Sequence, residues 1–238
     1  MDNLFDPTAA RKLIVSLAIA AGLLQPAGPA VAADCDGAAR PGVDWSGCRK
    51  RNLIMDGSKL ERAAMAEADF TSTDLRNSNL VRADFSKATL VRSMLDGSVA
   101  PDASFEKAVG FRTSFAGADL AGANFTKSEM QRADFTRAKL NGIDFEKSEL
   151  GRAVFTEAAI DGTRFRYSNL ARADFRKARF ETAIDFEGAY LYRTRFEGVD
   201  LSKAKGIAQW QIDLACGDAS TKLPQGINPA SGWPCAEE

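Results

Sequence analysis

The sequence predicts an all-β solenoid whose chain turns a corner every five residues. Two observations carry this prediction. Every fifth residue from Leu60 to Phe180 is Leu, Phe, Met or Ile, except Ala100 and Gly110. The residue two places before each of these centres is Ala, Ser or Thr, with Ile143 as the exception. Neither the helical period of about 3.6 nor the strand period of about 2 divides five, so neither an amphipathic helix nor a simple alternating strand explains the pattern.

A second period, of 20 residues, indicates how the corners combine. Phenylalanine recurs at this spacing in two series, Phe85, Phe105, Phe125, Phe145 and Phe165, and Phe115, Phe135, Phe155 and Phe175. Four sides of five residues therefore make one square coil. The large centre and the small residue before it point inward, and the coils stack about 4.8 Å apart, the spacing of paired strands. Residues 55–201 give about seven coils.

Two departures from the period predict local irregularities. One residue is inserted after Phe180, because the period resumes only at Phe186. This insertion predicts a bulge at a corner near Ile184 and Asp185. Pro101, together with the small centres at residues 100 and 110, predicts a thinned or bulged coil over residues 98–111.

Individual repeats indicate a family. Segments such as Ala68-Asp69-Phe70 and Ala123-Asn124-Phe125 resemble the A-(D/N)-(L/F)-x-x unit of pentapeptide-repeat proteins, and the resemblance covers more than half of the chain. It implies a right-handed quadrilateral β-helix with very short strands and tight turns at the corners. Residues 204–218 also resemble the C-terminal segment of exported bacterial members.

The N-terminus predicts a secretory signal peptide. Arg11 and Lys12 precede an apolar run from Leu13 to Leu24, and small residues ending at Ala33 offer two small-x-small cleavage sites. The apolar run is short for a membrane span, so an uncleaved anchor is only the alternative. We therefore expect an exported protein, periplasmic or secreted, whose mature chain has no transmembrane segment. We expect no lipid anchor, because an aspartate rather than a small residue precedes the first cysteine.

Both ends of a solenoid need covers, because open coils expose backbone donors and an apolar axis. The predicted parts are a signal peptide over residues 1–33, an N-terminal cap over 34–54, the β-helix over 55–203, and a C-terminal helical cap and tail over 204–238.

A short helix is predicted within the C-terminal cap, over Ala208–Cys216, with Gly217 placed to terminate it. Trp210, Ile212 and Leu214 are expected to cover the final coil. A Trp210 that faces solvent would instead indicate a homodimer formed end to end through this cap.

The four cysteines lie two on each side of the periodic region. In an exported protein this placement predicts one local disulfide at each end, Cys35–Cys48 and Cys216–Cys235. A zinc site built from all four cysteines is the alternative, which the lack of a C-x-x-C pair disfavours.

The sequence offers no recognisable catalytic, cofactor or metal site. It contains no histidine, which removes Ser-His and Cys-His nucleophilic machinery, histidine metal sites and a histidine pH switch. Most carboxylates directly precede a repeat centre, where they are expected to bond the backbone of tight turns rather than form a glycosidase-like pair; examples are Asp69, Asp84, Asp119, Asp134 and Asp174. An enzyme would need a cleft formed by the two end regions.

One surface feature is unusual. Two places after the centres, Lys87, Lys107, Lys127 and Lys147 recur every 20 residues, and Arg92, Arg112, Arg132, Arg152 and Arg172 do the same. They predict a basic strip on two adjacent faces. Glu129 and Glu149, and Asp134 and Asp174, are available as local counter-charges. The strip is therefore either an internally neutralised face or a binding surface for a polyanionic envelope component or an acidic protein.

The predicted function is that of a non-enzymatic structural or protein-interaction module of the bacterial envelope. Its partner is expected to be a protein or an anionic envelope component and not nucleic acid, because the formal charge is only −1. Some pentapeptide-repeat proteins resemble B-form DNA and protect or inhibit type II topoisomerases, which is the alternative. The signal peptide, the near-neutral charge and the basic ladders depart from that pattern.

Overall fold

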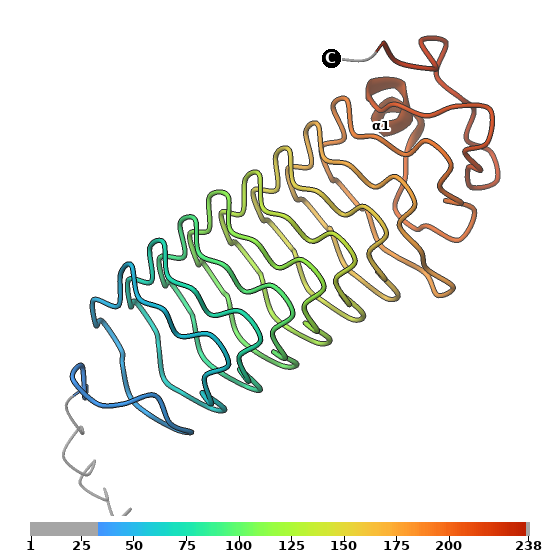
Figure 1. Cartoon of the computed structure of the whole chain (residues 1–238). Coiled ribbons are helices and arrows are strands. Elements are labelled where there is room, and N and C mark those ends of the chain that lie inside the picture. Colours follow the sequence, from blue (N-terminus) through green and yellow to red (C-terminus); the bar gives the residue numbers. More distant parts are fainter. Residues whose placement is uncertain (1–32, 237–238) are drawn as a thin grey trace, which may run out of the picture. The chain divides into compact units, whose positions relative to one another are not determined.

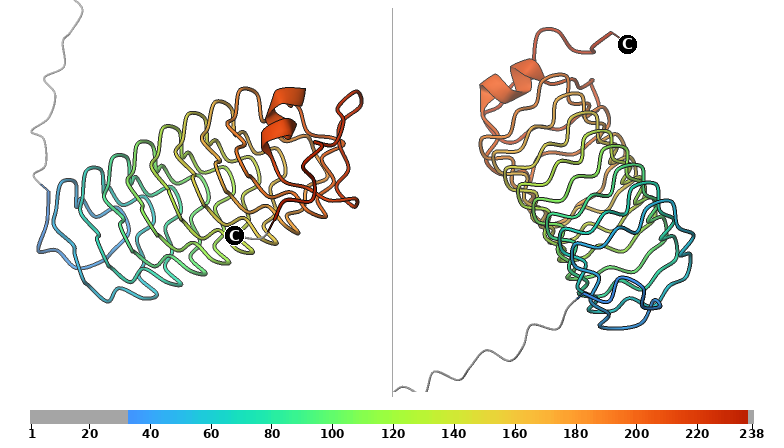
Figure 2. Two further views of the ribbon diagram at one scale, coloured as in Figure 1. Left: turned by 90° about the horizontal axis from the view of Figure 1, so that it is seen from above. Right: turned by 90° about the vertical axis from the view of Figure 1, so that its left-hand side faces the viewer.

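The computed structural model of the chain describes residues 33–236, which form a rod of stacked, four-sided coils (Figure 1). The predicted signal peptide lies outside the described residues, except for Ala33. The views from above and from the end show the coils following one another at even spacing, with the chain's C-terminal segment at one end of the stack (Figure 2).

Neighbouring coils are joined by parallel bridges between single residues 20 places apart, such as Ser104 with Asn124. These bridges run from the pair of Asp44 and Ala64 to that of Asp200 and Lys222. Within residues 33–236 no two bridged residues are consecutive, so the very short strands expected of the fold are reduced to one residue per side.

The backbone of each side is bonded in three directions. The amides of Phe105 and Lys107 donate to the following coil, that of Val109 donates to the preceding coil, and that of Ala108 closes the turn, all at 2.7 to 3.0 Å. Only the first residue of each turn has no backbone acceptor. In many turns this amide donates instead to a side-chain oxygen two residues earlier, as Ser86 does to Asp84 at 2.9 Å.

This pattern explains why the coil over residues 98–111 is neither thinned nor bulged, contrary to the sequence-based prediction. Its bridges continue without interruption. Pro101 takes the first turn position, where the missing amide hydrogen costs no bond between coils. At Gly110 the sulfur of Met130 fills the space, lying 2.3 Å from where a Cβ would stand.

Two stacks of phenylalanine rings fill the axis, as the period of 20 predicts. Ring centroids within a stack lie 4.5 to 5.3 Å apart, and rings of the two stacks meet edge to face at 5.4 to 6.0 Å. The small inward residues are buried beside them, and several of their hydroxyls bond carbonyls of the preceding coil, as Ser93 does with Phe70 at 2.8 Å. The rod therefore has a closed core and no channel.

The coils begin earlier than predicted. Val43, Trp45 and Cys48 point inward and are buried, so residues 41–60 already form a complete coil and are not a separate cap. From residue 41 to 201, leaving out the inserted one, 160 residues make eight coils of 20 instead of seven. Only residues 33–40 lie before the first coil.

The inserted residue produces a bend at Glu181 and Thr182, close to the predicted corner. The bridge across it joins Arg164 to Asp185, 21 residues apart. The Asp161 carboxylate accepts hydrogen bonds from both bent amides, at 2.7 and 2.9 Å. Bonding from the Thr182 amide, and then from that of Glu181, holds the pKa of Asp161 below its ordinary value.

The C-terminal helix α1 spans Gln209–Leu214, shorter than predicted by one residue at its start and two at its end. It is far too short to cross a membrane, and the described part of the chain contains no other helix. Ile212 is buried against the last coil, as predicted, whereas Trp210 is 51% exposed. Gly217 does not terminate the helix. It leaves room for the ring of Trp233, which a Cβ there would meet at 2.4 Å.

Candidate functional site

The predicted basic residues share an unusual backbone position. Each corner of the coil is a tight turn whose second residue has a positive φ, for example 57° at Lys107 and 58° at Arg112. All nine predicted residues of the strip occupy this position. A side chain in this left-handed conformation costs about 1 kcal/mol relative to glycine, because its Cβ crowds the following carbonyl oxygen.

The structure arranges these residues as two straight columns on adjacent corners. We call Lys87, Lys107, Lys127 and Lys147 the lysine column, and Arg92, Arg112, Arg132, Arg152, Arg172 and Arg193 the arginine column. Arg193 was not predicted. The inserted residue shifts the register by one, so Arg193 stands one coil beyond Arg172, and counting the period across the insertion would have found it.

Glutamates neutralise the lysine column. Three of its members form ion pairs, Lys87 with Glu67 at 2.8 Å, Lys107 with Glu106 at 3.2 Å and Lys147 with Glu146 at 2.9 Å. The hydrogen bond from Lys87 holds the pKa of Glu67 below its ordinary value. Glu149, an expected counter-charge, accepts a hydrogen bond from Asn169 instead. The predicted neutralisation exists, but through other acids.

The arginine column is not neutralised in the same way. Among the described residues, no carboxylate forms an ion pair with Arg92, Arg112, Arg132 or Arg152. The expected partners bond the turn that follows them: Asp134 accepts from the amide of Thr136 at 2.8 Å, and Asp174 binds the guanidinium of Arg176 at 2.6 Å. The two predicted ladders are therefore chemically different surfaces.

Glycine is distributed unequally over the four corners. One of the two remaining corners has Gly42, Gly122, Gly142 and Gly162 at the left-handed position, and the other has Gly57, Gly97, Gly117 and Gly198. At the corner of the arginine column no glycine occurs there from residue 52 to residue 193. The chain therefore accepts the backbone cost of a long side chain at six successive levels of that corner.

The residues directly before the arginines are uncharged: Val91, Phe111, Gln131, Gly151, Ala171 and Tyr192. Phe111 is 37% exposed, and the guanidinium groups of Arg112 and Arg132 lie 5.3 and 5.9 Å from its ring centroid. Tyr192 stacks on Tyr190 with centroids 6.2 Å apart. The arginine column is thus flanked by a neutral, partly aromatic strip.

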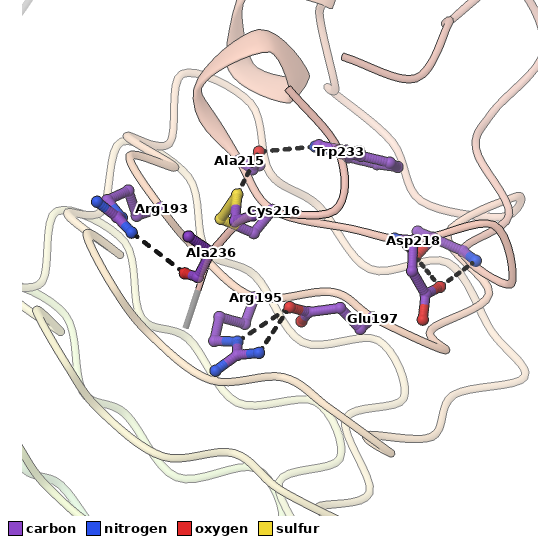
Figure 3. Close-up of a disulfide and its surroundings, with 10 residues drawn as sticks. Arg193, Arg195, Glu197, Ala215, Cys216, Asp218, Trp233 and Ala236 are labelled. Atoms are coloured by element: carbon purple, nitrogen blue, oxygen red, sulfur yellow. Dashed lines mark hydrogen bonds and ion pairs between the residues drawn. A yellow bond between two sulfur atoms is a disulfide. The ribbon is translucent and has the colours of Figure 1, made fainter. Parts of the chain in front are cut away.

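At its C-terminal end the arginine column meets a small pocket of about 110 Å³ (Figure 3). Arg172, Arg193 and Arg195 line it together with the Cys216–Cys235 disulfide. Arg195 pairs with Glu197 at 2.9 Å, and Arg193 donates to the carbonyl of Ala236 at 3.5 Å. The disulfide thus holds the tail of the chain against the last arginine of the column.

The cysteines form the two disulfides that the sequence predicts, with Cα–Cα distances of 5.4 and 5.5 Å. The zinc alternative therefore has no ligands, because residues 33–236 contain no free cysteine. The five aspartates before repeat centres each accept the amide two residues on, at 2.8 to 3.3 Å: Asp69, Asp84, Asp119, Asp134 and Asp174. They serve the turns, as expected.

Family models for pentapeptide repeats match this geometry in sequence. The model of the pentapeptide repeat region matches residues 128–205, and that of pentapeptide repeats in eight copies matches segments over 54–126, together more than half of the chain. The chain belongs to the pentapeptide-repeat family. Its members are generally non-enzymatic scaffolds. No curated protein matches the sequence.

One solved structure shows the same fold. QnrB1, a plasmid-mediated fluoroquinolone resistance protein, aligns with a TM-score of 0.55 at 17% identity, over 79% of this chain and 92% of its own. This chain therefore shares with QnrB1 the right-handed quadrilateral β-helix of the family. HetL, involved in heterocyst differentiation regulation in the cyanobacterium Nostoc, aligns with a TM-score of 0.27 at 22% identity, over 79% and 85% of the two chains. A pentapeptide-repeat protein of the Arabidopsis thaliana thylakoid lumen aligns with a TM-score of 0.20 at 22% identity, over 60% and 79%.

Proposed function

We propose that this protein is an exported, non-enzymatic scaffold of the bacterial envelope that works through its outer surface. The observation that carries the proposal is the closed axis, in which stacked phenylalanine rings fill the interior of the described coils and leave no channel for a substrate there. Function then falls to the exposed corners and faces, and the chemically distinct corner is that of the arginine column.

Export is supported by the ends of the chain. Disulfides persist in oxidising compartments such as the periplasm, and both pairs staple the terminal segments to the rod. The residues expected to form the signal peptide lie directly before the first cysteine.

Export can be tested by mass spectrometry of the protein recovered from cell fractions. We expect an N-terminus at residue 33 or 34 and no thiol that reacts with an alkylating reagent before reduction. An intact Met1 with four reactive thiols, found in the cytoplasm, would contradict export.

A working outer surface can be tested by cross-linking in cells. A photo-cross-linking residue is placed at the left-handed position of each corner in turn, at Arg82, Lys127, Arg132 or Arg137, none of which is glycine. Because the four sites share one backbone conformation, they differ only in the side of the rod that they report. We expect cross-links to envelope components to concentrate on one or two adjacent corners. Equal labelling of all four corners, or none, contradicts a binding surface on the coils.

The alternative function, a DNA mimic that binds a topoisomerase, needs a surface that is acidic along its length. A column of six arginines opposes that role. We therefore expect the purified protein to leave the supercoiling activity of a type II topoisomerase unchanged, and inhibition at low micromolar concentration would restore the alternative.

A further inference from the structure

The arginine column differs from every other corner of the rod in three respects that have independent causes. It contains no glycine, four of its members face no described carboxylate as an ion-pair partner, and the residue directly before each arginine is uncharged. Repetition of one sequence unit would explain a column of like residues, but not why glutamates pair with three lysines of one column while four arginines of the other have no carboxylate partner among the described residues. Such a surface is suited to binding an anionic ligand.

We infer that the arginine column binds a linear acidic polysaccharide that lies along the rod with one carboxylate or sulfate facing every second arginine. The inference rests on the proposed function, because it names the partner class of the surface. A guanidinium group takes a carboxylate or sulfate through two parallel hydrogen bonds, a geometry that an ammonium group cannot provide.

The spacing of the column favours this class of polymer. Stacked rings in successive coils lie 4.5 to 5.3 Å apart, so successive arginines are attached at about the same interval along a straight line. Each pyranose unit of an extended, twofold polysaccharide advances the chain by a similar distance, but neighbouring sugars face opposite ways. The charges on one face of the chain therefore recur at about twice the coil spacing and stay in register with every second arginine.

Other polyanions lose this register. In an extended peptide the side chains on one face repeat every second residue, at about 6.6 Å, so an acidic peptide drifts by about one coil over four contacts. The phosphates of duplex nucleic acid wind around its axis and leave a straight column after a few contacts. A flat membrane would meet the corner without selecting one charge per coil.

The neutral strip beside the column supplies the rest of the site. The exposed ring of Phe111 lies below the guanidinium groups of Arg112 and Arg132, and Gly151 leaves the surface beside Arg152 without a side chain. Aromatic faces pack against the C–H faces of sugar rings. The ring of Phe111 can therefore contact a sugar chain whose charges face the arginines, and Gly151 leaves space for it.

The test measures binding of the purified, disulfide-bonded protein to polygalacturonate, which carries one carboxylate per sugar, at increasing salt. The fully methyl-esterified polymer keeps the sugar chain and lacks the charge. One variant combines Arg92→Gln, Arg112→Gln, Arg132→Gln and Arg152→Gln. Its matched control combines Lys87→Gln, Lys107→Gln, Lys127→Gln and Lys147→Gln, the same loss of charge at the same backbone position.

We expect the arginine variant to lose about 10-fold in affinity, the effect of two exposed ion pairs, and to show a shallower salt dependence. The lysine variant should lose less than about threefold, because three of its four charges are already paired within the rod. Circular dichroism and the unfolding midpoint should match those of the wild type in both variants, which separates lost binding from lost structure.

Three outcomes would overturn the inference. They are an absence of binding to polygalacturonate at low salt, an equal loss in both variants, and equally tight, arginine-dependent binding to polyglutamate, single-stranded DNA or anionic vesicles. Cross-linking of the arginine variant in cells separates the two proposals. If the cross-links of the arginine variant persist on one corner, the surface function stands and the polysaccharide is wrong; if the wild type already labels all corners equally, the surface function falls as well.

Discussion

The two ends of the rod solve one problem in different ways. At the N-terminal end, residues 33–40 cover only part of the first coil: the amide of Asp34 bonds the carbonyl of Asp44, and Lys50 lies 4.1 Å above the ring of Trp45. The opposite side stays open. There the side chain of Ile54 is 88% exposed. The next coil is bonded through the carbonyl of Leu53 and the amide of Met55, so the backbone groups of Ile54 itself face the open end.

At the C-terminal end the last coil is closed on every side. Buried Gln211 donates to the carbonyls of Phe186 and Ala189 at 2.9 and 2.8 Å, and it accepts from the amide of Ala208 at 2.8 Å. Trp233 donates to the carbonyl of Ala215 at 2.7 Å. The Gln211 side chain thus replaces two of the bonds that a further coil would have made, and backbone groups of Leu214 and Cys216 accept others from the last coil.

The largest expected effect contrasts the interior with the open end. Ile143 and Leu53 occupy the same inward position of a side, but Ile143 is fully buried and Leu53 is 40% exposed. We expect Ile143→Ser to lower the free energy of unfolding by about 4 kcal/mol, since it leaves a cavity and buries a hydroxyl. Leu53→Ser should cost less than about 1 kcal/mol. The free energies of unfolding of both variants, measured by chemical denaturation, test this comparison. Equal losses of stability would mean that the open end is covered in solution.

The disulfides give the next effect. Their sequence separations are 13 and 19 residues, so loop-closure entropy assigns each about 3 kcal/mol. Loss of the two disulfides should have different effects on the segments that they hold. Without Cys35–Cys48, residues 33–40 keep few bonds to the rod, and the fluorescence of Trp45 should shift to the red.

Without Cys216–Cys235, the tail keeps the Trp233 bond and the bridge of Lys222 to Asp200. It should therefore stay docked, with unchanged exchange protection at the amide of Lys222. The measurement uses paired Cys→Ala variants. Release of the C-terminal tail, with residues 33–40 still in place, would reverse the comparison.

Gln211→Leu should destabilise the C-terminal end by about 2 kcal/mol, because it leaves a buried carbonyl and an amide without partners. The helix-surface substitution Asp213→Asn, which keeps the acceptor for Gln209, serves as the control and should change stability by less than about 0.5 kcal/mol. Hydrogen exchange should accelerate in the last coil first. Uniform acceleration along the rod would show that the end does not unfold separately from the body.

The ends also predict where two copies meet. Trp210 is half exposed on α1, the condition under which we expect a dimer through the C-terminal cap. Two N-terminal ends would instead bring together Arg49, Lys50 and Arg51 of both copies. Sedimentation should show a dimer that Trp210→Ser abolishes and Ile54→Ser retains, and the reverse result would place the contact at the N-terminal end.

The smallest effect is a pH dependence of the C-terminal end. Hydrogen bonds from Lys222, and then from Ser202, lower the pKa of Asp200 to about 2. A carboxyl whose pKa is lower in the folded state stabilises fully above its unfolded value of about 3.9 and loses this contribution as the pH falls toward the folded value. The amide of Lys222 should therefore lose protection between about pH 4 and pH 2. Asp200→Asn should remove that pH dependence, and an unchanged dependence would contradict the assignment.

The sequence predicted the regular coils well and the first coil poorly. The first coil was missed because Lys50 stands at a centre position, where the pattern calls for a large apolar residue. Lys50 is tolerated there because the end of the rod lets its ammonium group reach the carbonyl of Cys35 at 2.6 Å. Burial still removes water from this ammonium group, and the resulting desolvation lowers the pKa of Lys50 below its ordinary value. Only a terminal coil has such an exit.

The candidate site shows the same division. The nine predicted basic residues lie where the period of 20 places them, and Arg193 extends the second column across the inserted residue. The acids expected to neutralise them were predicted wrongly. An aspartate before a corner accepts a hydrogen bond from the amide of the turn that follows it, as Asp134 does from Thr136. Adjacency in sequence therefore did not identify the ion pairs.

By itself the sequence determined the five-residue side, the inward residues, the position of the insertion and the residues that form each column, because all of these follow from a period that repeats along the chain. The tertiary structure decided where the coils begin, how each end is closed and which column is neutralised. These outcomes depend on contacts between residues of different coils, such as Glu67 with Lys87, and on the absence of a further coil at each end. Only the folded stack brings those residues together.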